Sequence, residues 1–447
     1  MKTKRYIIFL FLSLLSLAGC SDYLDLKGNN TQAVPTTLAD LQALLNDNTR
    51  MNGNLTPAML ESWADDYYLP MERYERLVDI FQRNYRWDLG DYNHANDWST
   101  GYTPVYNANI CLEGLQRIRR DGTNSEQYDR ILGASLFFRA YYFQQLLWAF
   151  APIYDAATAA TDIGIVLKED TDFNTPSVRS SVQAGYDRVI KDTEWALSLL
   201  PERAAIPTQP SQVAAHGLLA RTYLSMRRYE DALRHANEAL LLKSDLMDFN
   251  KKADGVDPSQ LFAIQKYNKE VIFHSEISIY GGNLCSGAPV DTLLLKSYRL
   301  GDLRTNCFFI QSGGYPIFRA NYALSYMFSG LATDELYLIK AECLAREGKV
   351  GDAMNVLNHL LKYRFDANKV YPPLTAQTKE EALDIVLLER RKSLLFRGLR
   401  LPDIKRLNKE GRDIAIVRKL GDKTYRMEPN DPRLVQPIPE DLRGFVK

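Results

Sequence analysis

Hydrophobic residues in the middle of the chain recur at helical spacing. One face is formed by Ala215, Leu218, Leu219, Thr222, Tyr223 and Met226. After a short break at Arg227-Arg228, a second face is formed by Tyr229, Ala232, Leu233, Ala236 and Leu240. Because residues three and four apart share one side of a helix, the pattern predicts two helices joined by a tight turn. Small residues allow the two helices to approach closely, namely Ala220, Ala232 and Ala239.

This helical pair resembles a tetratricopeptide repeat, and a weaker second copy keeps the same spacing. The second copy consists of Tyr337, Ala341, Leu344, Gly348, Ala353 and Leu360. Two further helices, 128–150 and 182–200, are expected to stack against the first pair in a right-handed array. The sequence therefore predicts a mostly α fold, a tetratricopeptide-like scaffold with helix pairs within about 128–242 and 333–365. Such a scaffold alone defines no function.

Two long segments lack this periodicity. Residues from about 49 to 103 are rich in loops and aromatic residues, and residues 245–321 mix Gly, Pro and Ser with short apolar runs. Long irregular segments in a folded protein commonly carry function. We expect any binding surface to lie on these two segments.

The start of the chain has the features of a secretory leader. Basic residues precede an apolar run over 6–17, which is shorter than the roughly 20 residues needed to cross a bilayer. The run ends in Leu17-Ala18-Gly19-Cys20, which resembles the bacterial lipobox. The alternative is an ordinary signal peptide with an incidental cysteine. We predict that residues 1–19 are a lipoprotein signal peptide and that Cys20 is lipidated, with 20–447 as one body tethered by several acyl chains.

Composition and charge limit the functional classes. The chain is 46% hydrophobic and 25% charged, with a formal net charge of zero, so it lacks the basic surface that nucleic-acid binding requires. The five histidines are scattered, and the catalytic and phosphate-binding motifs of common enzymes are missing from the sequence. We therefore expect no enzyme activity, no cofactor and no metal site. Cys285 and Cys307 lack zinc-site spacing and could instead pair as a disulfide.

Asp65 and Asp66 could mimic the two carboxylates of a glycosidase. Adjacent residues on a helix point in different directions, so a capping or surface role is favoured.

Aromatic residues are the candidates for a binding surface, because flat rings stack on the apolar faces of sugars and also grip peptides. The candidates are Trp63, Tyr67, Trp87, Tyr92 and Tyr280, with Tyr298 and Tyr315 as alternatives. The competing interpretation is that these rings pack in the interior, as most large aromatic side chains do. Gly90 and nearby Asp and Asn residues predict a loop, so Trp87 and Tyr92 are preferred for exposure, whereas Trp98 is expected to be structural.

Several ordered blocks resemble the SusD/RagB-like lipoproteins of Bacteroidetes. The first blocks are Cys20-Ser21-Asp22-Tyr23-Leu24-Asp25-Leu26, Tyr102, Tyr106, Asn109 and Leu112, and 132–143 with its Phe-Phe-Arg-Ala-Tyr-Tyr-Phe run. The strongest lies within the C-terminal block 385–447 and contains Glu389, Arg390, Leu394, Gly398, Arg400, Asp403, Arg406 and the closing Gln436-Pro437-Ile438-Pro439. Ser393 and Arg397 stand where the family usually has glutamate, and Leu401 and Leu407 where it usually has an aromatic residue.

The C-terminal block can be interpreted without the family. Residues 385–396 form an apolar-periodic helix, and Gly398 is a plausible helix stop. Arg390, Arg400, Asp403 and Arg406 could form an anion or catalytic site, but we expect the arginines to tie the last helix to carboxylates of the core.

The resemblance implies a surface-exposed, lipid-anchored protein of the outer membrane that captures a glycan or an oligopeptide. It also implies a role as lid for a SusC-like TonB-dependent transporter, with the repeats facing the transporter and the irregular loops facing the ligand. Two other classes stay open: a lipid-anchored adaptor that binds a protein partner, and a lipoprotein hydrolase with an unrecognised site.

Overall fold

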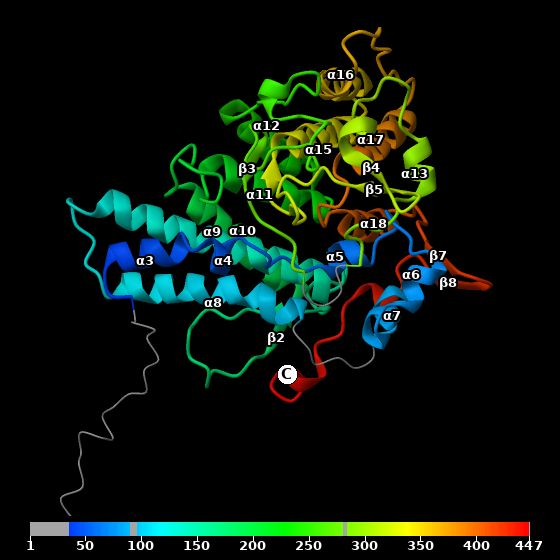
Figure 1. Ribbon diagram of the computed structural model, residues 1–447. Helices are drawn as coiled ribbons and strands as arrows, with labels where there is room; N and C mark the ends of the chain where they lie inside the picture. Colours follow the sequence, from blue (N-terminus) through cyan, green and yellow to red (C-terminus); the bar gives the residue numbers. More distant parts are fainter. Residues whose placement is uncertain (1–34, 90–95, 280–283, 447) are drawn as a thin grey trace, which may run out of the picture. The chain divides into compact units, whose positions relative to one another are not determined.

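Helices dominate the computed structural model, which describes residues 35–89, 96–279 and 284–446 (Figure 1). The helices and strands of these described residues lie in the unit that begins at Thr37. The longer helices are α3 (Leu38–Leu45), α8 (Asp97–Gln116), α9 (Ser125–Phe150), α10 (Val182–Leu197), α11 (Gln212–Ser225), α12 (Tyr229–Leu242), α15 (Thr333–Arg346), α16 (Val350–Leu361), α17 (Lys379–Ser393) and α18 (Arg400–Asn408). Short helices are α4 (Asn48–Met51), α5 (Met59–Ser62), α6 (Met71–Glu75), α7 (Asp79–Tyr85), α13 (Thr292–Lys296) and α14 (Arg304–Phe308), with 3₁₀ turns η1 (Lys252–Asp254), η2 (Lys362–Arg364), η3 (Pro432–Leu434) and η4 (Glu440–Leu442).

The long helices pack one against the next in chain order. α8 contacts α9, α9 contacts α10, α10 contacts α11 and α11 contacts α12, which in turn packs on α15. α15 then contacts α16 and α17, so one hydrophobic core runs through the array. The predicted mostly α, tetratricopeptide-like scaffold is confirmed.

The two predicted repeats turn in the same way. Arg227, between α11 and α12, has φ +62°, and Gly348, between α15 and α16, has φ +79°. In each turn the next amide donates to a carbonyl five residues back, Arg228 to Tyr223 at 2.9 Å and Lys349 to Leu344 at 3.0 Å. The short break predicted at Arg227-Arg228 is therefore a left-handed turn that both repeats share.

Strands occur only as small antiparallel pairs in the described part of the chain. The pairs are β1 (Ile163–Val166) with β2 (Arg179–Ser181), β3 (Val271–Phe273) with β6 (Leu331–Ala332), β4 (Phe309–Ser312) with β5 (Tyr315–Phe318), and β7 (Ile416–Leu420) with β8 (Lys423–Met427). They lie in the connections between helices, so the irregular segments carry local hairpins and the core stays helical.

The helix predicted over 385–396 begins earlier and ends earlier than expected. α17 starts after Thr378, whose side chain accepts from the Glu381 amide, and it ends at Ser393. Gly398 has φ +72°, and its amide donates to the Glu61 carboxylate at 2.8 Å. The glycine therefore serves the turn between α17 and α18, where an L side chain would be strained.

The arginines of the C-terminal block bind carboxylates, as expected. Arg390 donates to Asp403 at 2.8 Å, and Arg400 holds Asp65 through two hydrogen bonds of 2.6 and 2.8 Å. The first pair joins α17 to α18, and the second joins α18 to the segment that follows α5. The structural interpretation of these arginines is confirmed, because paired guanidinium and carboxylate groups tie the elements together.

The family departures at 393 and 397 have local explanations. The Ser393 hydroxyl accepts from Arg304 at 2.8 Å, and Arg304 already has two carboxylate partners. Arg397 forms a twofold hydrogen bond with Asp334, 2.9 Å for each contact, and lies over the Tyr322 ring. Arg397, which stands where the family usually has glutamate, therefore has its own buried partner in Asp334.

The four cysteines of the described part are buried, and none of them takes part in a disulfide. Cys285 and Cys307 lie in different hydrophobic clusters, so the disulfide considered for them does not form in this structure. None of the helices within residues 35–89, 96–279 and 284–446 combines the length and the apolar character that crossing a bilayer requires.

Candidate functional site

Three of the predicted aromatic candidates lie in the interior. Trp63 is 1% exposed, and Tyr67 and Trp87 are each 4% exposed. The Trp63 indole donates to Asn84 at 2.5 Å, and the Trp87 indole donates to the Trp63 carbonyl at 3.3 Å. These rings hold the segment around α5 and α7 to the rest of the body.

The exposure expected for Trp87 is wrong. Trp87 follows α7 with φ +57°, and this turn directs its ring under Arg418, whose guanidinium carbon lies 4.4 Å from the ring centroid. The same guanidinium lies 5.3 Å from the Tyr67 ring. The sequence predicts a loop at this position and thereby an exposed ring, but the turn at Trp87 directs the indole into the interior.

The other predicted positions divide into two groups. Cys20, Tyr92 and Tyr280 lie outside the described residues. Tyr298 is buried and donates to the Lys392 carbonyl at 2.9 Å, whereas Tyr315 on β5 is partly exposed and meets Tyr68 edge-on at 6.4 Å.

Asp65 and Asp66 belong to an ion-pair cluster. Arg400 holds Asp65, and Arg391 donates to Asp66 at 2.7 Å. Burial raises the pKa of Asp66, whereas for Asp65 the effect of burial is outweighed by Arg400 and Arg391, which lower its pKa. The surface or capping role expected for this pair is wrong, because both carboxylates are occupied by guanidinium groups of the C-terminal block.

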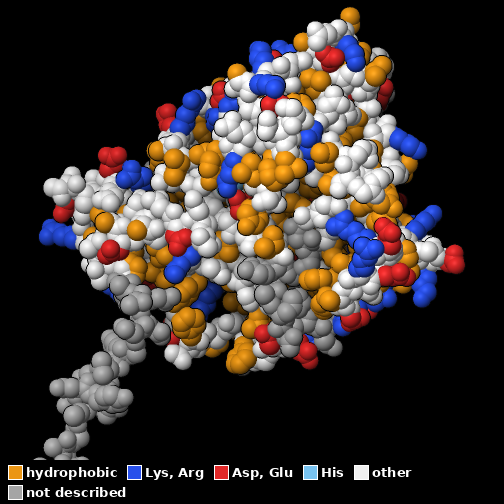
Figure 2. Space-filling view, in the orientation of Figure 1, with side chains coloured by type: hydrophobic (Ala, Val, Ile, Leu, Met, Phe, Trp, Pro, Cys, Tyr) orange, Lys and Arg blue, Asp and Glu red, His pale blue; other side chains and the backbone are white. Residues whose placement is uncertain are grey.

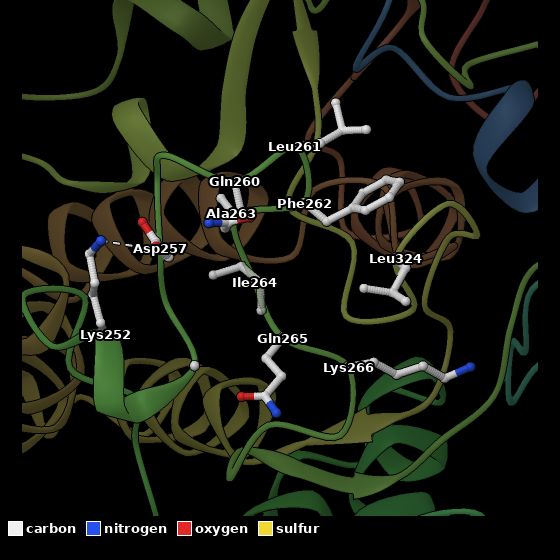
Figure 3. A pocket seen from close by; sticks show the side chains of 11 residues that line it. Lys252, Asp257, Gln260, Leu261, Phe262, Ala263, Ile264, Gln265, Lys266 and Leu324 are labelled. Carbon is white, nitrogen blue, oxygen red and sulfur yellow. Dashed lines mark ion pairs between the residues drawn. The ribbon is translucent and has the colours of Figure 1, made fainter.

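A cleft of about 550 Å³ opens in the irregular segment 245–321 (Figure 3). We call it the 252–266 cleft. It is lined by Lys252, Gly255, Asp257, Gln260, Leu261, Phe262, Ala263, Ile264, Gln265, Lys266 and Leu324. Its size is within the range of small-molecule sites, which are concave and combine apolar walls with a few polar groups.

The cleft wall is a loop held in shape by main-chain contacts. The Gln265 amide donates to the Gly255 carbonyl at 2.8 Å, and Gly255 has φ +82°. From outside the loop, the Arg319 guanidinium donates to the carbonyls of Gln260 and Pro258, 2.8 Å each. The lining side chains therefore stand on a defined backbone.

The cleft combines apolar and polar side chains. In Figure 3, Leu261, Phe262 and Leu324 lie on one side, where Lys266 also extends, and Lys252 and Asp257 lie on the other. Leu261 is 67% exposed, so its apolar side chain is accessible to a ligand in the cleft. Gln265 extends an exposed side-chain amide that can donate and accept hydrogen bonds.

The two lysines of the cleft already have acidic partners. Lys252 lies 3.0 Å from Asp257, and Lys266 lies 2.9 Å from Glu276. For Lys266, burial opposes the charged form but the Glu276 partner prevails and raises its pKa. On the face seen in Figure 2, side chains of both signs are likewise interspersed. Because each lysine of the cleft is paired with a carboxylate, the cleft has no excess charge that would favour a charged ligand.

Strained backbone flanks the cleft. Tyr267 and Leu324 both have left-handed φ angles, +58° and +60°. The Tyr267 ring, partly exposed, lies 5.1 Å from the Lys266 ammonium and meets the His274 ring edge-on at 4.8 Å. Such conformations in bulky residues concentrate at functional sites. The sequence carried little signal for this cleft, because its lining residues are neither clustered aromatics nor a motif.

The described residues contain no group of three or more His, Cys, Asp or Glu that could hold a metal ion. The cleft offers binding groups, and none of its lining residues is a histidine or cysteine.

Comparisons with known proteins agree with the fold. Residues 22–224 match a family model described as "Starch-binding associating with outer membrane", and residues 333–434 match the model of the SusD family. A SusD-like protein P2 of Formosa agariphila is 25% identical, with 99% of this chain and 98% of the relative aligned.

Solved structures share the architecture. The structure named "Putative sugar binding protein" from Bacteroides vulgatus is 18% identical with a TM-score of 0.72, and 93% of this chain and 99% of that one are covered. A laminarin-binding SusD-like protein is 16% identical with a TM-score of 0.62, covering 92% and 97%. The helical array, the C-terminal arginine block and the matched family models agree, and the chain belongs to the SusD/RagB family.

Proposed function

We propose that this protein is a cell-surface lipoprotein that captures a glycan in the 252–266 cleft. The observation that carries the proposal is the mixed lining of the cleft: Leu261, Phe262 and Leu324 present apolar surface, with exposed polar groups such as Gln265 nearby. A sugar ring has the matching chemistry, since it combines apolar C–H faces with a rim of hydroxyl groups. The starch-binding description of the matched model and the laminarin-binding neighbour support the same class.

A glycan fits better than an oligopeptide. A peptide brings charged termini, and burying a charge requires a free partner. Lys252 and Lys266 are both paired within the protein, so neither is available without breaking an ion pair. The hydroxyl groups of a sugar need only neutral donors and acceptors.

We also infer the cellular setting. Lipidation at Cys20 would tether residues 20–447 to the outer membrane. The variant Cys20→Ala tests this anchor. The helical array would face a SusC-like TonB-dependent transporter, and the irregular segments about 49–103 and 245–321 would face the ligand. The protein would then act as a lid that holds and releases glycan, by binding and opening and without bond chemistry.

The test uses the lipid-free chain from residue 21 and isothermal titration with neutral oligosaccharides from starch and laminarin, and with short peptides as the competing class. Leu261→Ser and Gln265→Ala should each weaken glycan binding at least fivefold. Leu241→Ser, at a leucine of α12 that is even more exposed than Leu261, is the matched control and should bind like the parent.

Three results would contradict the proposal. These are wild-type affinity in both cleft variants, equal weakening in the Leu241 control, and binding of peptides with no binding of any glycan. Circular dichroism of each variant verifies that the helical array is intact.

A further inference from the structure

A second concave site lies away from the 252–266 cleft. It has a volume of about 350 Å³ and is lined by Trp98, Ser99, Tyr102, Thr103, Val105, Tyr106, Val166, Lys168, Phe173, Ser177 and Val446. We call it the aromatic groove. It shares no lining residue with the 252–266 cleft.

Three distant parts of the chain build the groove. α8 provides one wall, β1 and the segment after it provide the second, and the C-terminal stretch closes it. Ser177 and Val446 form a parallel β-bridge that joins the second wall to the third. In Figure 1 the C-terminal stretch lies close to β2, below α8.

Four of the lining residues are aromatic. Trp98 and Tyr102 have ring centroids 4.9 Å apart, and Tyr106 and Phe173 lie 5.4 Å apart at an interplanar angle of 32°. Phe173 is 84% exposed, although its ring contacts Tyr106. A phenylalanine left so open gains little from burial in the free protein and offers its area to a ligand.

The polar groups of the groove are largely engaged. The Tyr102 hydroxyl donates to the Val166 carbonyl at 2.8 Å, and the Thr103 hydroxyl donates to the Ser99 carbonyl at 3.1 Å. The Lys168 ammonium is 2.9 Å from Asp170 and also donates to the Asp172 carbonyl. The groove therefore lacks an uncompensated charge and has few free donors for a sugar.

We propose that the aromatic groove binds an uncharged aromatic small molecule of about two or three rings. Four rings line it, and aromatic rings associate in offset or edge-on arrangements that add to the gain from buried area. Its volume is at the lower end of the range for small-molecule sites, which suits a compact ligand. This site does not depend on the proposed glycan function.

The probe is N-phenyl-1-naphthylamine, a neutral dye whose fluorescence rises in apolar surroundings, titrated into the lipid-free chain. We expect saturable binding with one site. Phe173→Ala should weaken it about tenfold, or about 1.4 kcal/mol. Tyr106→Leu, which keeps an apolar side chain but removes the ring, should weaken binding in the same direction.

Trp195→Ala is the matched control, because Trp195 is a half-exposed aromatic residue on α10 that does not line the groove. It should leave dye binding unchanged. Oligosaccharide in excess should not displace the dye, and Phe173→Ala should keep its glycan affinity.

The proposal is overturned if dye binding does not saturate, if both groove variants bind like the parent, or if Trp195→Ala weakens binding equally. Displacement by oligosaccharide would also overturn it, since the groove would then be part of the glycan site. Failure of the glycan screen alone would leave the dye result as an independent measurement.

Discussion

Arg406 and Glu342 form a twofold ion pair in the interior, with Nη1–Oε1 and Nη2–Oε2 distances of 2.6 and 2.8 Å. The pair joins α18 to α15, and neither side chain is more than 1% exposed. Burial raises the pKa of Glu342, but Arg406 and Arg346 outweigh it and lower that pKa to about 2. The twofold ion pair thus holds the C-terminal block against the second repeat.

Removing Arg406 should strongly destabilise the fold. Arg406→Met leaves Glu342 buried with Arg346 as its remaining partner, and loss of one member of a buried pair costs about 3–5 kcal/mol. Urea unfolding followed by circular dichroism measures the loss. Arg426→Met, at an exposed pair with Glu428, should cost less than about 1 kcal/mol. A loss below that in Arg406→Met would contradict the role assigned to the pair.

The same pair predicts sensitivity to acid. The folded pKa of Glu342, about 2, is below its ordinary value of 4.5, so the unfolded chain takes up the proton first as pH falls. The stabilisation is fully present above pH 4.5 and is lost as pH falls toward 2. The difference in unfolding free energy between the parent and Glu342→Gln should shrink over that window. A difference that stays constant with pH would refute this assignment.

Lys405 should make the stability of the fold depend on pH in the neutral to alkaline range. Its ammonium donates to the carbonyls of Trp148 and Ala151 at 2.8 and 2.9 Å, and burial lowers its pKa from 10.5 to about 7. Between these values the unfolded chain binds more protons, so stability rises with pH from about 7 to 10.5. Lys405→Met should remove this rise, whereas the exposed Lys419→Met should keep it. Equal slopes in parent and Lys405→Met would show that Lys405 does not titrate there.

Trp87→Ala should lower the stability of the fold. The indole is buried beneath Arg418, and truncating a buried tryptophan typically costs about 3–5 kcal/mol. Thermal unfolding should show a large drop, and Trp195→Ala at a half-exposed position should show a small one. A Trp87→Ala protein with unchanged stability and lost glycan affinity would restore Trp87 as a ligand contact.

Cys20→Ala tests the anchor. The variant should move from the membrane fraction to the soluble fraction, because the thiol that would carry the lipid is gone. Ser21→Ala, which keeps the thiol, serves as the neighbouring control. Immunoblots of fractionated cells measure the distribution, and a Cys20→Ala protein still fully membrane-bound would disprove lipid anchoring at this residue.

Helices and arginine roles that depend on local spacing or on charge were predictable from the sequence. Periodicity placed α11, α12, α15 and α16 because one face of each must be apolar to pack. The spacing of the C-terminal block predicts arginines that pair with carboxylates, and Arg400 and Arg406 form such ion pairs. Their partners, Asp65 and Glu342, lie far along the chain and could not be named from spacing.

Exposure of the aromatic residues could not be predicted from the sequence. Trp87 and Phe173 both stand beside turn-forming residues, yet one is covered by Arg418 and the other is open. The difference depends on which distant segment folds over each ring.

By itself, the sequence determined the helical repeats, the resemblance to the SusD/RagB family and the expectation of a lipidated Cys20, since these depend on neighbours along the chain. Only the tertiary structure decided that Trp63, Tyr67 and Trp87 are interior and that the 252–266 loop meets Leu324 to form a cleft. The physical reason is that burial and cavity shape arise from contacts between remote segments, held here by arginines such as Arg319 and Arg418.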